Sequence, residues 1–514
     1  MQRPWLAHYP ATIPADLPDF PYRSLTDLFD EAFTQHRALP AFHFMGASVS
    51  FGELDRQSAA FAAYLQSLGL VKGDRVALMM PNVPQYGVAV AGVLRAGMVV
   101  VNTNPLYTPR ELEHQLADSG ARAIVILENM AHTLEACRGA TPIEHIVLTA
   151  VGDMLPSPKR LLVNFVLRRV RKMVPAYALP GAVRWTTAIA KGKAASFRKV
   201  DTTLEDVAVL QYTGGTTGVS KGATLLHRNI IANVLQSELW HSPAMQRIPQ
   251  GEQVVTISAL PLYHIFGFTV NLMLAMRTGG CNVLIVNPRD LPSVFKALKA
   301  QPFHSFPAVN TLFAALARHK DAGSVDWSSL KLSVGGGMAV QPATAKAWFE
   351  LTGSAICEGY GLSETSPSAS CNPVDDVSYT GTIGLPLPST DFRILDDENR
   401  DVAAGERGEI AIRGPQVMAG YWNRPDETAL AMTEDGYFKT GDIGVMRPDG
   451  YFAIVDRKKD MINVSGFNVY PNEIEEIVTQ MPGIVEAAAI GVPDESSGEA
   501  VKLFVVTADT AMTV

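Results

Sequence analysis

The sequence predicts an α/β protein of at least two domains, and three observations carry this prediction. The chain has 514 residues, of which 47% are hydrophobic and 18% charged, a composition that suits several packed cores and excludes disorder. Helical patterns alternate with short apolar runs, as in parallel sheets covered by helices. From about Gly381 onward, short runs with frequent Gly and Pro indicate twisted antiparallel β-structure.

The expected elements follow one another in a regular order. The region before residue 115 should contain the helices 58–68 and 86–96 and the strands 75–80 and 98–102. The alternation returns after residue 200, in the strands 207–213, 254–260, 283–286 and 330–334 and the helix 227–240. A charged stretch at 456–460 precedes a last βα pattern, with a helix over 474–480 and a strand over 485–490. We therefore expect one domain over 1–456 and a second over 457–514.

Charge and cysteine content exclude several classes of protein. The net charge of −8 argues against a protein that binds nucleic acid. The four cysteines suit neither a disulfide framework nor a zinc finger, and the N-terminus lacks the apolar core of a signal peptide. The two most apolar windows contain Arg95 and Arg277, so neither supplies the ~18 residues of a membrane span. We expect a cytoplasmic enzyme, and a homodimer is compatible with the sequence.

The acidic average conceals a basic segment over residues 154–200. It contains eleven Lys and Arg residues and no Asp or Glu. Between 159 and 173, apolar residues recur at three- and four-residue steps with basic residues between them, as in a basic amphipathic helix. Two interpretations stay open. The helix either contacts an anionic membrane surface, as on the inner face of the cell membrane, or packs on its own domain with a solvated basic face.

The strongest local signal is the segment Tyr212-Thr-Gly-Gly-Thr-Thr-Gly-Val-Ser-Lys-Gly222, which follows a predicted strand. Glycines allow backbone N–H groups to turn toward an anion, hydroxyl groups add donors, and a lysine adds positive charge. It is not a Walker loop, because Ser220 precedes Lys221 and a glycine follows it. The segment predicts a phosphate-binding loop made by Thr213, Gly214, Gly215, Thr216, Thr217, Gly218 and Lys221.

Three further motifs follow this loop, Gly359-Tyr-Gly-Leu-Ser-Glu364, Thr440-Gly-Asp442 and Asp456-Arg457. In this order the four motifs resemble the adenylate-forming enzymes, which include acyl-CoA synthetases, peptide-synthetase adenylation domains and firefly luciferase. The resemblance runs from about Ser50 to the end of the chain and is greatest to bacterial long-chain fatty acid–CoA ligases. It implies a large domain of two doubly wound αβ sheets and a distorted β-barrel, followed by a small, mobile α+β domain.

The resemblance implies a two-step reaction. A long-chain fatty acid would react with ATP in the presence of Mg²⁺ to give acyl-AMP and pyrophosphate, and CoA would then displace AMP. Thr213, Thr216 and Lys221 would hold the β- and γ-phosphates, and Glu364 would bind Mg²⁺ together with Thr216. The resemblance therefore implies that Lys221, Glu364 and Thr213 are catalytic.

Other motif residues would hold the nucleoside. Tyr360 would stack on adenine, Asp442 would accept hydrogen bonds from the ribose hydroxyls, and Arg457 would reach the ribose or a phosphate. The glycines that would flank the nucleotide are Gly335, Gly336, Gly337, Gly359 and Gly361. The first three follow a predicted strand but lack the rest of a dinucleotide-binding fingerprint.

The acid-binding side has one argument that is independent of the resemblance. No Asp or Glu occurs between Gln253 and Arg289, so a substrate ammonium group buried here would stay unpaired, at a cost of several kcal/mol. A fatty acid carries no such charge. The resemblance adds His264 as a catalytic residue against the substrate carboxylate, although a lone histidine beside aromatic residues is usually a core residue. It places Phe268 at an aromatic gate to the acyl tunnel.

The resemblance also implies a domain rotation for the second step. Lys459 would lie near the hinge, and Gly466 and Phe467 in a loop beside the channel for the pantetheine of CoA. One family feature is missing, because no Pro-x-x-x-x-Gly-Lys segment, whose lysine orients the adenylation substrates, occurs between Val469 and Val514. We therefore expect an incomplete small domain and a 514-residue chain that binds ATP but adenylates poorly.

Two alternatives to the ligase stay open. One is a fatty acyl-AMP ligase that loads the phosphopantetheine of a carrier protein, and the other is a non-catalytic homologue that binds ATP or lipid. Thioester formation with free CoA and with a carrier protein distinguishes them.

Overall fold

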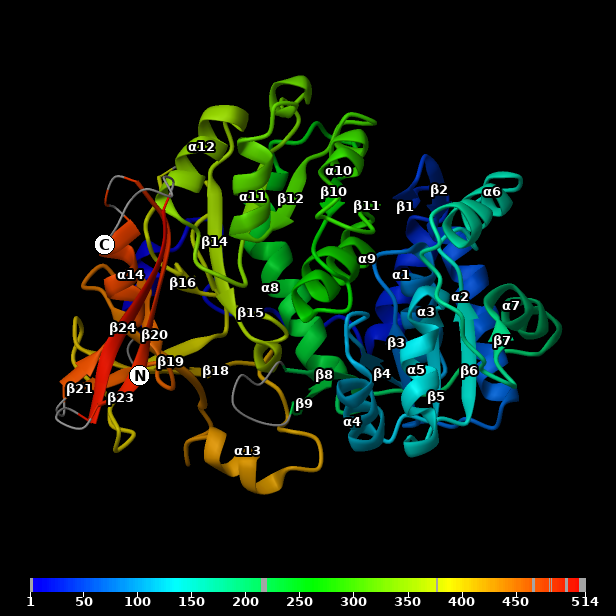
Figure 1. Ribbon diagram of the computed structural model, residues 1–514, viewed down its shortest axis with the longest axis horizontal. Coiled ribbons are helices and arrows are strands. Elements are labelled where there is room, and N and C mark those ends of the chain that lie inside the picture. The colour runs from blue at the N-terminus through cyan, green and yellow to red at the C-terminus, as the bar shows by residue number, and fades with distance from the viewer. Residues whose placement is uncertain are drawn as a thin grey trace.

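The computed structural model describes residues 3–213, 220–375, 378–464, 467–479, 481, 483–494 and 498–507. Within these ranges the strands form two large sheets and two four-stranded sheets. The chain contributes β1 and β2 to the second large sheet, builds the first large sheet, returns to complete the second, and then forms the two four-stranded sheets in turn (Figure 1). The α/β class and the order of the expected regions are confirmed.

The first large sheet has the strand order β7-β6-β5-β3-β4-β8-β9. Every pair from β7 to β8 is parallel, and only the edge strand β9 is antiparallel. Its strands are β3 (Arg75–Met79), β4 (Val99–Asn102), β5 (Ala123–Leu127), β6 (His145–Thr149), β7 (Val183–Arg184), β8 (Val207–Tyr212) and β9 (Gly222–Leu226). The predicted strands 75–80, 98–102 and 207–213 are thus confirmed.

The second large sheet has the order β16-β15-β14-β13-β12-β10-β11-β1-β2. The pairs from β14 to β1 are parallel, and both edges are antiparallel. Its strands are β1 (Pro40–Phe44), β2 (Ala47–Ser50), β10 (Val255–Ser258), β11 (Cys281–Leu284), β12 (Ser305–Ala308), β13 (Leu332–Gly335), β14 (Ile356–Gly361), β15 (Ser368–Cys371) and β16 (Leu385–Pro386). The predicted strand 283–286 is displaced by two residues.

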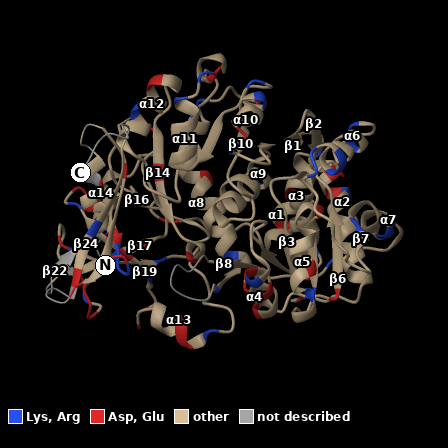
Figure 2. Cartoon of the chain, in the orientation of Figure 1, with Lys and Arg blue, Asp and Glu red and all other residues tan. Residues whose placement is uncertain are grey.

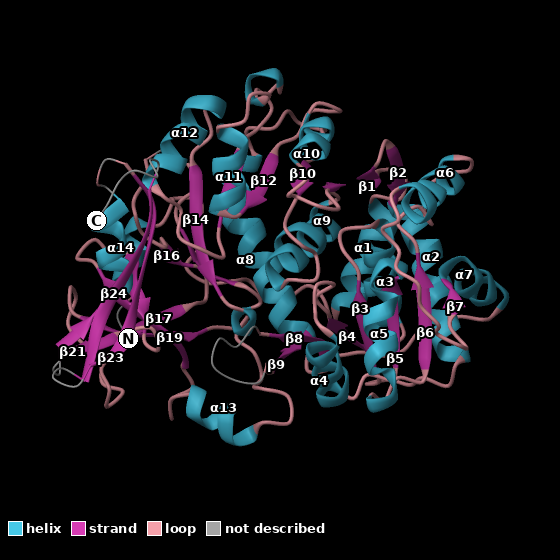
Figure 3. Cartoon of the chain, in the orientation of Figure 1, coloured by secondary structure: helices cyan, strands magenta, loops and turns pink. Residues whose placement is uncertain are grey.

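Alternate side chains of the strands enter cores on opposite faces of each sheet. In β3, Val76 and Leu78 face the core between the two sheets, whereas Ala77 and Met79 face a core under α4 and α5. A third core lies on the far side of the second sheet, under α10, α11 and α12. These outer helices are α4 (Pro109–Ser119), α5 (Ala131–Cys137), α10 (Leu291–Leu298), α11 (Asn310–Ala317) and α12 (Pro342–Thr352). Helices therefore cover both faces of both sheets (Figure 3).

The middle layer contains the helices that position the site. They are α1 (Leu25–Gln35), α2 (Phe51–Ser67), α3 (Pro84–Arg95), α8 (His227–Met245) and α9 (Leu274–Thr278), and α7 (Trp185–Ala194) packs on α2. Helix α2 begins at Phe51 rather than at residue 58, because the Ser50 side chain caps it by accepting the Glu53 N–H at 3.1 Å. Helix α8 contacts β8 and β9 of the first sheet and β13 of the second.

The antiparallel region lies where the barrel was expected. It is a sheet of the order β17-β18-β19-β20, with β17 (Asp391–Leu395), β18 (Arg407–Arg413), β19 (Phe438–Met446) and β20 (Phe452–Arg457). Helix α13 (Pro425–Ala431) is inserted between β18 and β19. A bridge between Gly384 and Phe452 links this sheet to the segment before β16.

The C-terminal sheet has the order β22-β21-β24-β23. Its elements are β21 (Ile462–Val464), β22 (Phe467–Val469), α14 (Pro471–Thr479), β23 (Ile484–Asp494) and β24 (Gly498–Thr507). The expected helix 474–480 and strand 485–490 are confirmed as α14 and β23. The expected boundary at residue 456 falls inside β20, which ends one residue later.

The basic segment is helical over a shorter stretch than its pattern suggests. Helix α6 (Lys159–Phe165) continues into a π-helical stretch over Val166–Val170. Figure 2 shows several Lys and Arg residues at α6. In the described part of the chain, no helix combines the length and the hydropathy that a membrane crossing requires.

Candidate active site

The phosphate-loop segment joins β8 to β9 at the edge of the first sheet. Residues Gly214–Val219 lie outside the described residues, so the predicted positions Gly214, Gly215, Thr216, Thr217 and Gly218 have no described geometry. The two ends of the segment meet, because the Thr213 N–H donates to the Lys221 carbonyl at 3.0 Å. His114 of α4 donates from Nε2 to the Ser220 carbonyl at 2.8 Å. The loop is therefore anchored at its base.

Lys221 and Glu364 are linked through one residue, Tyr421. The Tyr421 hydroxyl donates to Glu364 Oε1 at 2.8 Å, and Lys221 Nζ lies 5.1 Å from the centre of the Tyr421 ring. Lys221 also forms an ion pair with Glu427 of α13. The structure thus brings the predicted phosphate-binding lysine and the predicted metal-binding acid to the same place, although 143 positions separate them in the sequence.

Glu364 is a buried carboxylate. It is 7% exposed, and it follows β14 in a short 3₁₀ turn over Ser363–Thr365. Burial raises the pKa of Glu364, and the hydrogen bond from Tyr421 opposes this shift. A hydrogen bond from the backbone N–H of Glu364 itself also lowers this pKa, so the charged carboxylate is favoured from two sides.

The predicted nucleoside residues also converge. The Tyr360 hydroxyl donates to Asp442 Oδ2 at 2.5 Å, and Arg457 Nε lies 3.0 Å from Asp442 Oδ1. Asp442 sits in β19 and Arg457 directly opposite in β20. Burial raises the pKa of Asp442, while the Tyr360 hydroxyl and the Arg457 charge act against this shift.

Tyr360 also lines a cavity of about 320 Å³, whereas Asp442 and Arg457 are not among its described lining residues. Its polar end is lined by Gly336, Gly337, Gly359, Tyr360, Gly361 and Ser363. Its wall is largely apolar, with Trp240, Leu260, Ile265, Phe266, Val270, Val309, Val334 and Leu387. No Asp, Glu, Lys or Arg is among the lining residues that the structure describes.

Two of the predicted glycines are required by close contacts. A Cβ on Gly361 would lie 1.8 Å from the Pro367 carbonyl oxygen, and one on Gly335 would lie 2.6 Å from a Val340 methyl carbon. Gly335 itself does not line the cavity; it lies at the end of β13 and allows that close packing.

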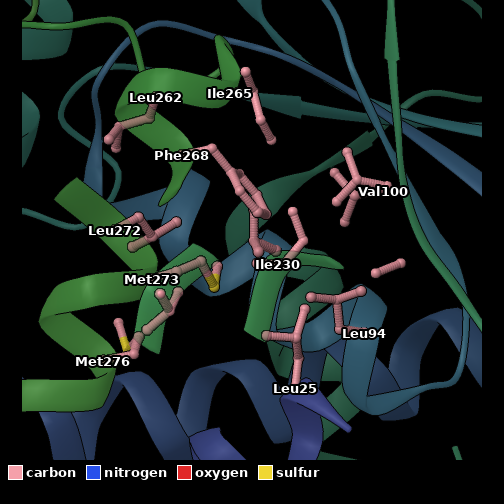
Figure 4. Packing of buried hydrophobic residues seen from close by; sticks show 14 of the residues in the cluster. Leu25, Leu94, Val100, Ile230, Leu262, Ile265, Phe268, Leu272, Met273 and Met276 are labelled. Carbon is pink, nitrogen blue, oxygen red and sulfur yellow. The ribbon is translucent and has the colours of Figure 1, made fainter. Parts of the chain in front are cut away.

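The two predicted substrate residues have different surroundings. His264 lines the cavity and is exposed, with its ring 4.7 Å from that of Tyr263. Phe268 is fully buried and does not line the cavity; it packs in the core among Leu262, Leu272 and Met273 (Figure 4). A gate role for Phe268 stays a prediction.

The residues predicted for the second step lie near the C-terminal sheet. Lys459 is in an exposed turn directly after β20, and the neighbouring Lys458 pairs with Glu409 and Asp397. Phe467 begins β22, and Gly466 lies outside the described residues.

Several site residues have no signal in the sequence pattern. Tyr421 and Glu427 belong to a loop and to α13, far from the motifs. Ser237 and His241 line the cavity from α8, where their spacing only indicates one helical face.

Comparison with known proteins gives a consistent result. Residues 29–422 match the AMP-binding enzyme family, and residues 473–513 match the AMP-binding enzyme C-terminal domain. The long-chain-fatty-acid–CoA ligase of Salmonella typhimurium is 54% identical over 514 residues, which cover the whole of this chain and 91% of the relative. The Bacillus subtilis protein of the same name is 38% identical over 510 residues, and the matched region covers 98% of this chain and 89% of the relative.

A solved structure extends this comparison. The anthranilate CoA ligase AuaEII in complex with anthranoyl-AMP superimposes with a TM-score of 0.81 at 25% identity, covering 96% of this chain and 88% of that one. The chain therefore belongs to the AMP-binding enzyme family and, within it, to the long-chain fatty acid–CoA ligases.

Proposed function

We propose that this chain activates a long-chain fatty acid with ATP to form acyl-AMP and pyrophosphate, and then transfers the acyl group to CoA with release of AMP. The observation that carries the proposal is the convergence of Lys221, Tyr421 and Glu364, where Glu364 directly follows Ser363 on the lining of a cavity with a glycine-lined end and an apolar wall. A triphosphate and a fatty acid need these two surroundings next to each other.

In the first step the carboxylate of the acid attacks the α-phosphorus of ATP. Lys221 supplies positive charge to the β- and γ-phosphates and then to the leaving pyrophosphate. Glu427 pairs with this lysine, so the triphosphate is proposed to compete with Glu427 for it. Thr213, Thr216 and the loop glycines are proposed to add hydroxyl and backbone donors.

Asp442 is suited to the ribose hydroxyls because a carboxylate accepts two hydrogen bonds. Its present partners, the Tyr360 hydroxyl and Arg457, would have to share it with the nucleoside. Gly336, Gly337, Gly359 and Gly361 leave room at this end of the cavity for the adenine, with Tyr360 against its face.

Glu364 fits a magnesium ion that is held mainly by phosphate oxygens. Mg²⁺ in such sites takes one or two carboxylates and keeps water and phosphate ligands, and no group of three or more acidic, His or Cys residues that could hold a metal is found within the described residues. Bound there, the ion would neutralise charge on the phosphates. Tyr421 fixes the carboxylate through its hydrogen bond, and Thr216 is proposed as a further ligand.

The apolar wall favours a fatty acid over an acid that also carries an ammonium group. An amino group buried against these residues would lack a counter-charge, whereas an alkyl chain gains free energy from burial. His264 lines the cavity and is proposed to contact the carboxylate end. Lys459, Gly466 and Phe467 are proposed to serve the CoA step.

The experiment is a series of fatty acids from four to eighteen carbons in a coupled AMP-release assay, with free CoA and with a phosphopantetheine carrier protein in parallel. We expect kcat/KM to rise with chain length and thioester to form with free CoA. An even response across lengths would contradict the apolar-tunnel argument, and transfer to the carrier alone would identify a carrier-loading enzyme.

We further propose that α6 and the following π-helical stretch lie on an anionic membrane surface. The apolar residues Leu161, Leu162, Phe165, Val170 and Met173 are between 53% and 65% exposed, so the helix turns an apolar face outward. Arg168 is not free for lipid, because it pairs with the buried Glu128 at 2.7 Å. The other cations of residues 159–173 are Lys159, Arg160, Arg169, Arg171 and Lys172, and Lys159 donates to the Met45 carbonyl.

Liposome flotation tests this contact. Replacing Arg169, Arg171 and Lys172 by glutamine should reduce binding to vesicles with anionic lipid more than tenfold, because each basic residue contributes about 1 kcal/mol at such a surface. The matched control replaces Lys191, Lys193 and Arg198, which are exposed in or after α7. If both triple variants float to the same extent, α6 makes no specific contact with the vesicles and is a solvated surface helix. The oligomeric state, with a homodimer as the prediction, is read from light scattering of the same samples.

A further inference from the structure

Among the polar side chains that line the cavity without a role in the proposed function, Ser237 and His241 come from one helix, α8. Both line the cavity from α8, and they are 2% and 7% exposed. They are four residues apart on one helix, so their side chains lie on the same face. Trp240, between them, holds this part of α8 by donating from Nε1 to the Asn372 carbonyl at 3.0 Å.

Within the described part of the chain, neither side chain makes a hydrogen bond to another residue, and their polar atoms are not among the fully enclosed unpaired ones, as expected for groups that border the cavity. Polar neighbours on the same helix are paired, since Asn233 donates to the Ser368 carbonyl and Gln236 to the Pro388 carbonyl, both at 2.7 Å. Buried polar groups in proteins are paired as a rule, and leaving one unpaired costs free energy. Two unpaired groups that border one cavity are therefore suited to a ligand that pairs with them.

The chemistry of the two groups defines that ligand. Burial lowers the pKa of His241 to about 4, so the ring is neutral near pH 7 and offers one donor and one acceptor. Ser237 also donates and accepts. A second carboxylate would be poorly served, because it only accepts and no Lys or Arg is among the described lining residues. A hydroxyl group, which donates and accepts, matches both.

We propose that Ser237 and His241 form a subsite for a hydroxyl group on the acyl chain, so that hydroxylated long-chain fatty acids are substrates in addition to unsubstituted ones. The proposal rests on the proposed function, because the subsite lies in the cavity assigned to the acyl chain. Its effect is on specificity, since the hydroxyl is remote from the bonds that form and break.

The test compares octadecanoic acid with its 3-, 10- and 12-hydroxy derivatives, by kcat/KM in AMP release and by isothermal titration calorimetry. We expect at least one hydroxy isomer to be used as well as octadecanoic acid or better. The substitution His241→Leu should lower the ratio of that isomer to octadecanoic acid about tenfold or more, and Ser237→Ala should lower it less. His241→Gln, which keeps a donor and an acceptor, should restore part of the ratio.

Ser242→Ala is the matched control, because the Ser242 hydroxyl donates to the Leu239 carbonyl and does not line the cavity. It should leave the ratio unchanged. Without ligand, His241→Leu should raise Tm, since it removes an unpaired buried polar group. A ratio that is the same in wild type, His241→Leu and Ser242→Ala would overturn the subsite. Calorimetry tests the subsite through binding alone, without turnover. If the wild type fails to turn over octadecanoic acid, that result contradicts the ligase function and not the subsite.

Discussion

Glu364→Gln lowers kcat/KM for acyl-CoA formation by about 100- to 1,000-fold, because the amide cannot serve as an anionic ligand for Mg²⁺ where charge develops on the phosphates. The fold should be retained, since glutamine has the same shape and can still accept the Tyr421 hydrogen bond. The measurement is initial rate against Mg²⁺ concentration at saturating ATP, where the variant should need far more metal.

Two further variants show whether that loss is specific to the Glu364 carboxylate. Tyr421→Phe should cause a smaller loss in the same assay, because it removes only the group that holds the carboxylate. Glu350→Gln, on the exposed side of α12, is the matched control and should behave as wild type. A Glu364→Gln enzyme with wild-type dependence on Mg²⁺ would remove Glu364 from the metal site.

Lys221→Met should weaken ATP binding about 10- to 100-fold, because a hydrogen bond to a charged group contributes about 1.5–3 kcal/mol. Glu427→Gln should act in the opposite direction. It removes the acid that pairs with Lys221, and a partly exposed pair of this kind contributes about 0–1 kcal/mol. We expect ATP to bind up to about fivefold more tightly, as measured by calorimetry.

Asp426→Asn is the control for Glu427→Gln, because it removes the same charge from the adjacent position of α13. It should change ATP affinity little. If Glu427→Gln and Asp426→Asn have equal effects, the change reflects net charge rather than the ion pair. If Lys221→Met binds ATP as wild type does, the loop lysine does not contact the phosphates.

The fold was most predictable where apolar periodicity is strong. The strands 75–80 and 98–102 and the helix between them match β3, β4 and α3 to within two residues, because these elements are buried and their apolar spacing is regular. The strand β14 is different. It reads Ile-Cys-Glu-Gly-Tyr-Gly, and its last three residues line the cavity instead of a core, so no alternation marks it as a strand.

Only the site residues that belong to the sequence motifs could be predicted. The resemblance identified Lys221, Glu364, Tyr360 and Asp442. In the structure Tyr360 contacts Asp442 directly, and Lys221 and Glu364 meet through Tyr421. It could not identify Tyr421, which connects Lys221 to Glu364, because that contact joins segments that have no local pattern in common. The outward apolar face of α6 was equally hidden, since spacing shows that a helix has two faces but not which one is buried.

The most direct test is a crystal structure with Mg²⁺ and a non-hydrolysable ATP analogue. Lys221 Nζ should contact the β- or γ-phosphate in place of Glu427, and Glu364 should approach the same triphosphate through the metal, with the ribose on Asp442. A nucleotide bound elsewhere, or one that Lys221 contacts while Glu364 faces away from it, would contradict a single ATP site formed by these residues.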